Sequence, residues 1–470
     1  MRKTKIVATI GPASDSPEII KKFIQAGVEV FRLNFSHGDQ EYHANVFNLI
    51  REISSSLKKP VAILQDLQGP KLRVGILAQE GIMLSKGDEV LLKLAEKSDD
   101  PKVIPIKEKE LIDALRPNAS VMLADGLIEL KVLEKRDNEV LCKVVNGGKL
   151  ESKKGINVPN ITINIPSVTS KDIDDIMFGI KLGVDFIAVS FVRKAADVLQ
   201  VKNILEASRV NIPVIAKVEK HEAVENIDDI VLASDGVMVA RGDLGVEIPL
   251  EEVPIVQKTI IEKCNRLGKP VITATQMLDS MIRNPRPTRA EVSDVANAIF
   301  DGTDAIMLSG ETAIGEYPVE SILTMAKIAE YTESQLKYSD ILRKRAEFST
   351  NSPTDAIGYA TCEIAQRLGA KAIITSTQSG YTARMVAKYR PAQPIIAVTP
   401  DERVQRRLLL FWGINPLTTR IYKTTDEMIE ASVQASLEAG FIRKGDTVIL
   451  TGGIPVGIGG TTNFLKVHQV

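Results

Sequence analysis

Eight short apolar runs that end on polar or charged residues constrain this chain most strongly. Helical periodicity fills most of the intervals between them, as in Pro17–Ala26, Lys171–Leu182 and Leu250–Leu267. Strands that alternate with helices form parallel βαβ units, and eight such units predict a closed (β/α)8 TIM barrel. The runs are Lys5–Thr9, Val30–Ser36, Val61–Asp66, Phe186–Ser190, Val214–Glu219, Gly236–Asp243, Val271–Gln276 and Ala305–Glu311.

The carboxyl ends of these runs carry the side chains that could do chemistry. Catalytic groups of such barrels lie at this end of the strands, so the sequence predicts an active site there. With only four histidines in the chain, a three-histidine zinc site or a Ser-His-Asp triad is not expected. The strand-end residues are Arg32, Asn34, Ser36, Asp66, Lys217, Glu219, Asp243, Thr275, Ser309 and Glu311.

The barrel pattern is interrupted between the third and fourth runs. Apolar residues there alternate, as in Glu89–Leu94 and Glu139–Val145, and Gly-rich turns separate the short segments. This pattern predicts a small β-barrel domain over residues 70–166, inserted at the catalytic end of the larger barrel. An insertion there is well placed to act as a lid, and a merely decorative insertion is the alternative.

The rest of the chain divides into two further units. The interrupted barrel is expected over residues 1–69 and 167–338. After a charged stretch, helical periods alternate again with apolar runs, which predicts a three-layer α/β domain over residues 339–470. The predicted strands are Ala372–Thr375, Ile395–Val398 and Thr447–Leu450.

Composition excludes several classes of partner. The formal net charge of −1 gives no electrostatic reason to expect nucleic acid or an anionic membrane. No apolar stretch is long enough to span a bilayer. Cys142, Cys264 and Cys362 match neither metal nor disulfide spacing and are expected to be buried spectators, as in a protein of the reduced cytoplasm.

A lysine and two carboxylates point to a cation site. Lys217 and Glu219 lie on the same strand face, because side chains alternate along a strand, and Asp243 ends the next run. Two carboxylates with open positions suit Mg²⁺ or Mn²⁺, and Lys217 beside them would stabilise developing negative charge. A buried Lys–Glu pair that merely closes the barrel mouth is the alternative.

Other segments carry weaker signals. Ala240–Gly245 is a small-residue turn whose backbone amides could hold a carboxylate or phosphate, although glycines there could serve only the turn. Arg32 and Arg73 are candidate phosphate ligands, with surface salt bridges as the alternative. Thr288–Glu291 fits a capping box and is interpreted as structural.

Five motifs resemble those of the pyruvate kinase family, and the resemblance covers the whole chain. It implies transfer of the phosphoryl group from phosphoenolpyruvate to ADP, which gives pyruvate and ATP. Chemistry of this kind depends on positioning and charge neutralisation, which the strand-end residues could supply. The motifs are Arg32–Gly38, Ile215–Glu219, Met238–Glu247, Ile272–Met281 with Asn284–Glu291, and Asp304–Thr312.

The resemblance also implies roles for individual residues. Lys217 would stabilise the transition state, and Glu219 and Asp243 would hold the divalent ion, while a second ion arrives with the nucleotide. Arg32 would contact the phosphate of phosphoenolpyruvate, and Gly242, Asp243 and Thr275 its carboxylate. Nucleotide-side positions are Asn34, Ser36, His37, Arg73 and Lys154, and Lys154 is expected on the return strand of the inserted domain. Candidates for orienting a water relay that protonates the enolate are Thr275, Ser309 and Glu311.

One departure from the family pattern concerns potassium. Potassium-dependent relatives have Thr-Lys-Gly-Pro-Glu after the strand-ending aspartate, whereas Asp66 here is followed by Leu-Gln-Gly-Pro and Lys71. The ammonium of Lys71 carries the charge of the missing ion, so K⁺ is not expected to be required. The alternative is that Lys71 faces solvent and K⁺ still binds through Asn34, Ser36 and Asp66.

The resemblance implies a regulatory site and an assembly. Thr375–Thr382 leads from a predicted strand into a helix, and its hydroxyls and amides suit a phosphorylated effector at Thr377, Ser379, Gly380 and Thr382, with Gly452–Thr462 closing over it. A purely structural turn is the alternative. A homotetramer is also implied.

Two other functions remain open at this stage. One is an aldolase-type barrel with Lys217 as a Schiff-base nucleophile. The other is a non-catalytic metabolite sensor.

Overall fold

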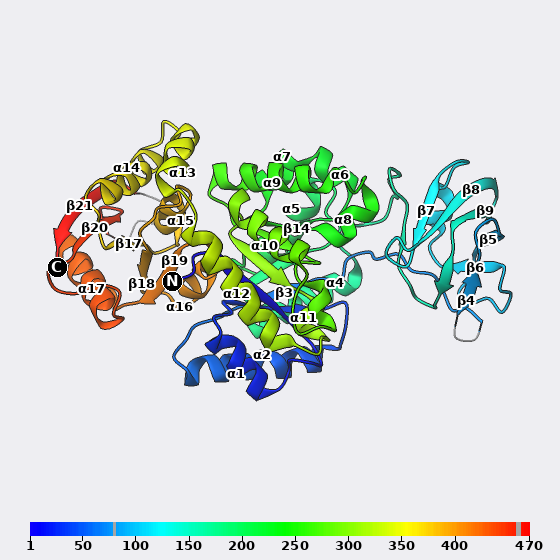
Figure 1. Cartoon of the computed structure of the whole chain (residues 1–470), viewed down its shortest axis with the longest axis horizontal. Helices are drawn as coiled ribbons and strands as arrows, with labels where there is room; N and C mark the ends of the chain where they lie inside the picture. The colour runs from blue at the N-terminus through cyan, green and yellow to red at the C-terminus, as the bar shows by residue number, and fades with distance from the viewer. Residues whose placement is uncertain (79–80, 457–461) are drawn as a thin grey trace.

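The computed structural model describes residues 1–78, 81–456 and 462–470, and a closed parallel barrel forms its centre (Figure 1). The strands follow the order β1-β16-β15-β14-β13-β12-β3-β2, and each pairs in parallel with its neighbours. The fold class expected from the eight runs is confirmed. The strands are β1 Lys5–Ile10, β2 Val30–Asn34, β3 Ala62–Asp66, β12 Phe186–Val189, β13 Val214–Val218, β14 Gly236–Ala240, β15 Val271–Ala274 and β16 Ala305–Leu308.

Helices surround this barrel, and local capping signals fix their ends. In α4, Thr169 and Asp172 form a capping box, and Gly183 ends the helix with a φ of 80° that favours glycine. Thr288 and Glu291 form the expected capping box of α10. The helices are α1 Pro17–Gln25, α2 Gln40–Ser56, α4 Ser170–Leu182, α5 Ala195–Ala207, α6 His221–Glu225, α7 Ile227–Ala233, α8 Arg241–Glu247, α9 Val253–Leu267, η1 Asp279–Ile282, α10 Arg289–Asp301, α11 Gly310–Ala313 and α12 Pro318–Ser334.

A curled β unit projects from the carboxyl end of the barrel, at the right of Figure 1. Its six-stranded sheet has the order β11-β7-β8-β9-β5-β6, and β10 pairs with β4. Residues from Leu72 to Ile163 build a separate apolar core inside it. The elements are β4 Ile82–Leu84, β5 Glu89–Leu94, β6 Val103–Ile106, α3 Lys109–Ala114, β7 Ser120–Leu123, β8 Ile128–Arg136, β9 Glu139–Asn146, β10 Gly148–Leu150 and β11 Ile156–Asn157.

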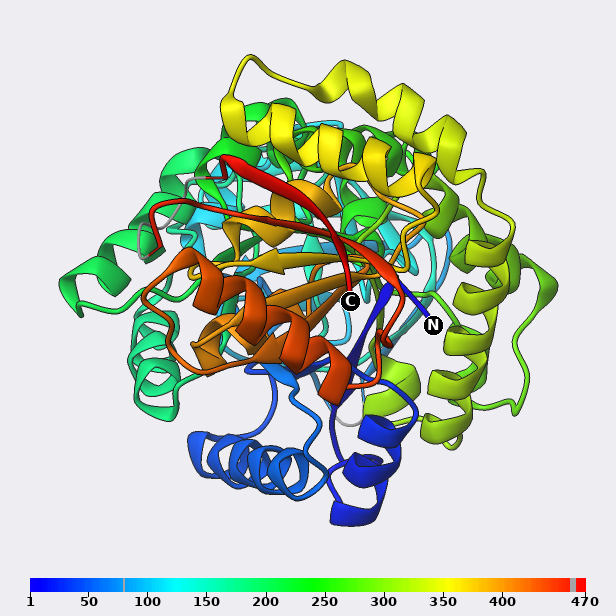
Figure 2. The ribbon, with the colours of Figure 1, turned by 90° about the vertical axis from the view of Figure 1, so that its left-hand side faces the viewer.

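The C-terminal part of the chain forms a second α/β unit, which lies in front of the barrel in Figure 2. Its sheet order is β19-β18-β17-β20-β21, with only β21 antiparallel. Two of these strands, β19 and β21, lay outside the sequence prediction. The elements are α13 Tyr338–Arg345, η2 Ala346–Phe348, α14 Pro353–Arg367, β17 Ala372–Ser376, α15 Tyr381–Ala387, β18 Ile395–Thr399, α16 Glu402–Leu408, β19 Ile414–Thr418, α17 Thr425–Glu438, β20 Thr447–Gly452 and β21 Phe464–Gln469.

The cysteines and the apolar helices bear on two expectations from the sequence. The three cysteines are free and buried, as predicted. Within the described ranges, no helix combines the length and apolar character needed to cross a membrane.

Candidate active site

A buried cluster of charged side chains lies at the carboxyl ends of neighbouring barrel strands. Lys217 Nζ lies 2.9 Å from Glu219 Oε1 and 3.1 Å from Asp66 Oδ1, and it donates a hydrogen bond of 2.7 Å to Ser190 Oγ. Arg32 Nε donates to Asp66 Oδ2 at 2.6 Å. Asp66 is fully buried and Lys217 is 8% exposed. The structure therefore brings together residues that are up to 187 positions apart, from Arg32 to Glu219.

The charges in this cluster stabilise one another. Burial disfavours the charged form of Lys217, but Asp66 and Glu219 together raise its pKa above the usual value. Burial likewise opposes ionisation of Asp66, but Lys217 and Arg32 hold its pKa below the usual value. The charged form of Lys217 is thus favoured inside a buried site, where a charge acts strongly on bound groups. A Schiff-base nucleophile must be a neutral amine, so this environment disfavours the aldolase-type alternative.

Two hydroxyl residues belong to this cluster although the sequence analysis did not select them. Ser190 Oγ accepts from Lys217 and donates to the Leu67 carbonyl at 2.7 Å. Thr9 Oγ1 accepts from Arg32 Nη1 at 3.0 Å. Both residues end apolar runs, so the rule that found the other strand-end residues could have found these two.

Glu219 and Asp243 form the carboxylate pair proposed for a divalent ion. Glu219 Oε2 accepts from the Phe191 amide at 2.7 Å, while Oε1 pairs with Lys217. Burial raises the pKa of Glu219; Lys217 lowers it, and the charge of Asp243 raises it again. The two carboxylates therefore repel each other, and a shared divalent cation would relieve that repulsion. Across the described residues, no set of three His, Cys, Asp or Glu side chains is grouped so that it could hold a metal ion.

A strained turn brings Thr275 to the start of α8. Thr275 has a φ of 68°, in the left-handed region that a β-branched residue rarely adopts. Its Oγ1 accepts from the Gly242 amide at 2.7 Å and donates to the Ala274 carbonyl at 2.6 Å. Arg241 holds the turn through its bond of 2.7 Å to the Thr275 carbonyl. Gly242 and Thr275 thus lie together as expected, and strain of this kind is typical of functional sites.

Basic side chains gather at the mouth of the barrel. Burial lowers the pKa of His37, and the charges of Arg73, Lys71 and Arg32 lower it further. These four side chains therefore share one electrostatic environment, although they come from different segments of the chain.

The remaining nucleotide-side candidates lie at the surface of the mouth. Asn34 Oδ1 accepts from the Ser36 amide at 3.2 Å. Lys154 does not lie on a strand, as the sequence analysis assumed, but in the turn between β10 and β11, where its Nζ is 3.2 Å from Glu151 Oε2. Its side chain is 45% exposed and could reach a bound ligand.

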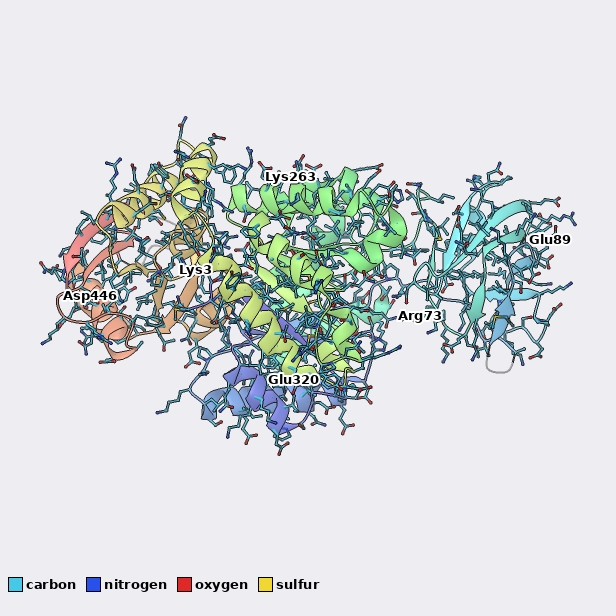
Figure 3. All side chains as sticks on the ribbon, viewed as in Figure 1. Lys3, Arg73, Glu89, Lys263, Glu320 and Asp446 are labelled. Carbon is cyan, nitrogen blue, oxygen red and sulfur yellow. The ribbon has the colours of Figure 1, made fainter. Side chains whose placement is uncertain are left out.

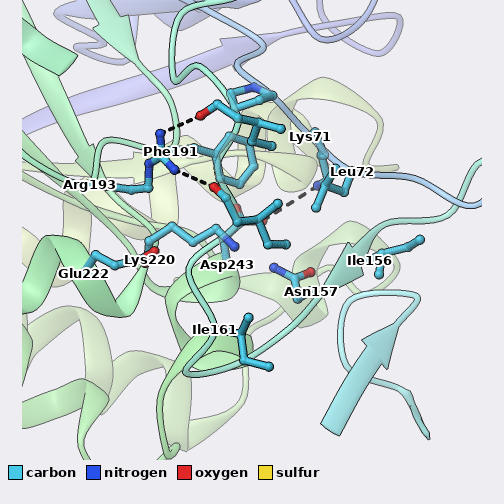
Figure 4. A pocket seen from close by; sticks show the side chains of 13 residues that line it. Lys71, Leu72, Ile156, Asn157, Ile161, Phe191, Arg193, Lys220, Glu222 and Asp243 are labelled. Carbon is cyan, nitrogen blue, oxygen red and sulfur yellow. Dashed lines mark hydrogen bonds and ion pairs between the residues drawn. The ribbon is translucent and has the colours of Figure 1, made fainter. Parts of the chain in front are cut away.

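Lys71 lies beside the proposed metal carboxylate. Its Nζ is 3.7 Å from Asp243 Oδ1, the pair marked by a dashed line at the right of Figure 4. Asp66, its neighbour in sequence, has both oxygens paired with Arg32 and Lys217. The Lys71 ammonium therefore lies next to Asp243 at the edge of the site, and it forms no ion pair with Asp66.

The candidates for a proton relay differ in their surroundings. The Glu311 carboxylate accepts from the amides of Leu278 at 3.0 Å and Ser309 at 2.8 Å, so it shapes the loop after β16. Ser309 Oγ is buried and makes no hydrogen bond to any described group. Ser309 is thus better placed than Glu311 to bond a water or a substrate.

A second polar cluster joins the β unit to the barrel. Buried Glu247 accepts from Asn157 Nδ2 at 2.7 Å and pairs with Lys220 Nζ at 2.6 Å. From the barrel side, Arg193 donates to the carbonyls of Ile163 at 2.7 Å and Ile165 at 2.6 Å (Figure 4). Glu247 ends one of the motifs quoted above, but nothing in the sequence paired it with Asn157 or Lys220, because these residues are separated in the chain.

The proposed effector loop takes the predicted place between β17 and α15. The Thr377 amide donates to the Val398 carbonyl at 3.0 Å, and Thr382 Oγ1 lies 2.8 Å from Thr462 Oγ1. Gly380 has a φ of 81° at the start of α15, and Ser379 is exposed. The predicted closing turn Gly452–Thr462 includes residues 457–461, which lie outside the described residues.

Fold and site together define an α/β-barrel enzyme with a charged cluster at the carboxyl ends of its strands. Comparison with known protein families shows which barrel enzymes this chain is similar to. The family model for the pyruvate kinase barrel domain matches residues 1–322, and that for the pyruvate kinase alpha/beta domain matches residues 355–468.

Full-length relatives agree with these matches. A pyruvate kinase of Geobacillus stearothermophilus is 52% identical over all of this chain and 80% of its own length. One from Bacillus licheniformis is 51% identical over all of this chain and 81% of its own. One from Clostridium acetobutylicum is 48% identical over the whole of both chains. The chain belongs to the pyruvate kinase family.

Proposed function

We propose that this chain transfers the phosphoryl group of phosphoenolpyruvate to ADP and that the buried lysine cluster carries the chemistry. The supporting observation is the position of Lys217, charged and enclosed by Asp66, Glu219 and Ser190 at the carboxyl ends of the strands. Family membership supplies the reaction.

Lys217 would stabilise the negative charge that develops on the substrate during phosphoryl transfer. Negative charge spreads over the phosphoryl group and onto the enolate oxygen, and a fixed ammonium in a dry site stabilises it without reorganisation. Glu219 and Asp243 would hold Mg²⁺ or Mn²⁺, which when bound neutralises and orients anionic substrate oxygens. Asp66 and Ser190 would keep the ammonium in position.

The other residues would position the two substrates. Arg32, already oriented by Asp66 and Thr9, would contact the phosphate of phosphoenolpyruvate. Thr275 and the amides of Gly242 and Asp243 would take its carboxylate. The nucleotide would lie on the basic mouth, against Asn34, Ser36, His37, Arg73 and Lys154.

The domain limits remain part of this proposal. We infer that residues 70–166 act as a lid over the barrel of residues 1–69 and 167–338. Lid closure would bring Arg73 and Lys154 onto the nucleotide and exclude water. Residues 339–470 would form the regulatory domain.

We propose that Lys71 replaces potassium. Its ammonium lies 3.7 Å from Asp243 Oδ1 and contributes to the positive field at His37. A tethered cation supplies unit charge without capturing a free ion. If K⁺ is still used, Asn34, Ser36 and Asp66 would bind it, although both Asp66 oxygens already have partners.

The potassium proposal is tested in a buffer whose only monovalent cation is a bulky tetraalkylammonium. Activity should change less than tenfold when KCl is added at matched ionic strength, and Lys71→Glu should be poorly active until K⁺ is supplied. Activation of the parent enzyme by tenfold or more, about 1.4 kcal/mol, would contradict the proposal.

Regulation and assembly follow from the family resemblance. We expect a phosphorylated metabolite at Thr377, Ser379, Gly380 and Thr382, a homotetramer, and a place in the cytoplasm. A panel of phosphorylated metabolites at subsaturating phosphoenolpyruvate would reveal the effector as a shift in the half-saturating concentration.

A coupled assay for pyruvate, with phosphoenolpyruvate, ADP and Mg²⁺, tests the main activity. Turnover that requires all three supports the proposal. Absence of turnover together with binding of phosphoenolpyruvate would instead favour the metabolite sensor. Borohydride trapping of a keto acid on Lys217 would favour the aldolase.

A further inference from the structure

An arginine-lined cavity lies between the barrel and the C-terminal unit, at the end of the barrel opposite the active site. Its volume is about 750 Å³. Segments that precede β12 and β13 form the barrel side, and α16 with the loop after β17 forms the other side. A cavity of this size is suited to a small molecule.

The charges that line the cavity are unbalanced. The two aspartates in its lining are already engaged: Asp185 pairs with Arg51 Nη2 at 2.6 Å and Arg406 Nε at 2.8 Å, and Asp401 caps α16 by accepting from the Arg403 amide at 2.7 Å. Three other arginines in the lining form no ion pair with any described residue. They are Arg209, Arg403 and Arg407.

Arg407 shows the imbalance most clearly. One of its Nη groups donates to the Asn211 carbonyl, while its Nε is buried and has no hydrogen-bond partner among the described groups. Burial lowers its pKa; Asp185 and Asp401 oppose that shift, and Arg403 and Arg406 add to it. A buried guanidinium donor without an acceptor is costly, and a bound anion would satisfy it.

The loop after β17 adds neutral donors to the same cavity. Gln378 and Ser379 line it, whereas Thr377 and Thr382 do not. The cavity therefore adjoins the proposed effector loop and shares Ser379 with it, but its lining excludes Thr377, Gly380 and Thr382. A ligand here would contact the barrel and this loop at once.

We propose that this cavity binds a phosphate-bearing small molecule through Arg209, Arg403 and Arg407. Guanidinium groups match phosphate oxygens in pairs, and the net positive lining favours a ligand with two or more negative charges. Occupancy would connect the barrel to the loop after β17, independently of the catalytic roles proposed above.

The probe is inorganic pyrophosphate, titrated by calorimetry into the full chain without Mg²⁺ at constant ionic strength. The test variant is Arg209→Gln with Arg403→Gln, at two exposed positions whose replacement leaves the buried Asp185 pairs intact. Arg367→Gln, on the exposed side of α14, removes one arginine charge elsewhere in the C-terminal unit and serves as the control.

We expect submillimolar binding by the parent chain and Arg367→Gln, and at least tenfold weaker binding by the double variant. Thr382→Val should bind like the parent. Equal binding by the double variant and the parent overturns the proposal, as does the absence of binding. Loss of binding in Thr382→Val or Arg32→Gln alone would assign the anion to the effector loop or the active site, and would also overturn it.

Discussion

The barrel is joined to the β unit and to the C-terminal unit in two different ways. The β unit keeps its own apolar core, and polar contacts such as Asn157–Glu247 and Lys71–Asp243 connect it to the barrel. In contrast, inward-facing barrel residues such as Val7 and Phe186 share one apolar core with the C-terminal unit. Figure 3 shows Arg73 at the first junction and Lys3 at the second.

This difference indicates which junction can move. A junction of a few polar contacts can rearrange at small cost, since water replaces the lost hydrogen bonds. Separating a shared apolar core exposes surface at about 25 cal/mol per Å², so that junction resists motion. The β unit is thus suited to open and close, and the C-terminal unit to transmit strain.

The largest expected effect is on stability, at the C-terminal junction. Asp304 pairs with Arg390 Nη1 at 2.8 Å, and both are buried. Asp304→Asn should lower the free energy of unfolding by about 3–5 kcal/mol, because it leaves a buried guanidinium without its counterion. Chemical denaturation measures this, with Asp340→Asn in an exposed pair as the control. Equal losses in both variants would contradict a firm junction.

The second effect is catalytic. Lys217→Met should lower kcat by about 10²–10³-fold or more, because the role proposed for this charge is to stabilise the transition state. The KM for phosphoenolpyruvate should stay within a few-fold of the parent value. Steady-state kinetics measure this, with Lys263→Met, at a half-buried position paired with Asp228, as the control. A near-normal kcat would remove Lys217 from the chemistry.

The third effect concerns the metal. Glu219→Gln or Asp243→Asn should raise the Mg²⁺ concentration for half-maximal activity by tenfold or more, since each removes one carboxylate of the proposed metal site. Mg²⁺ titrations of the variants and of Glu320→Gln, on α12, make the comparison. Curves that all overlay the parent would place the ion elsewhere.

The smallest effect tests the proposal that the junction between the β unit and the barrel can rearrange. Glu247→Gln removes the charge that holds Asn157 and Lys220, so the β unit should close less readily. We expect KM for ADP to rise up to tenfold, about 1.4 kcal/mol, with little change in kcat. The same measurement on Glu262→Gln, in an exposed helical pair, is the control. A large loss of stability without a kinetic effect would make Glu247 structural only.

Sequence alone determined the barrel and most of the cluster, because both depend on local periodicity. Alternation along a strand placed Lys217 and Glu219 on one face, and the end of the run identified Asp66. Helix ends such as Thr288 with Glu291 followed from capping chemistry within one turn. Parallel strands in a closed barrel then brought these ends together without further information.

Only the tertiary structure decided which partner each side chain meets across the chain. Lys71 lies beside Asp243 and not Asp66, and Glu247 accepts a hydrogen bond from Asn157 of the β unit. Arg407 Nε has no hydrogen-bond partner among the described residues. The shared core between barrel and C-terminal unit has no local signature either. Such contacts form only when whole units pack against one another. The residues that meet there are far apart in the sequence, so no local periodicity predicts them.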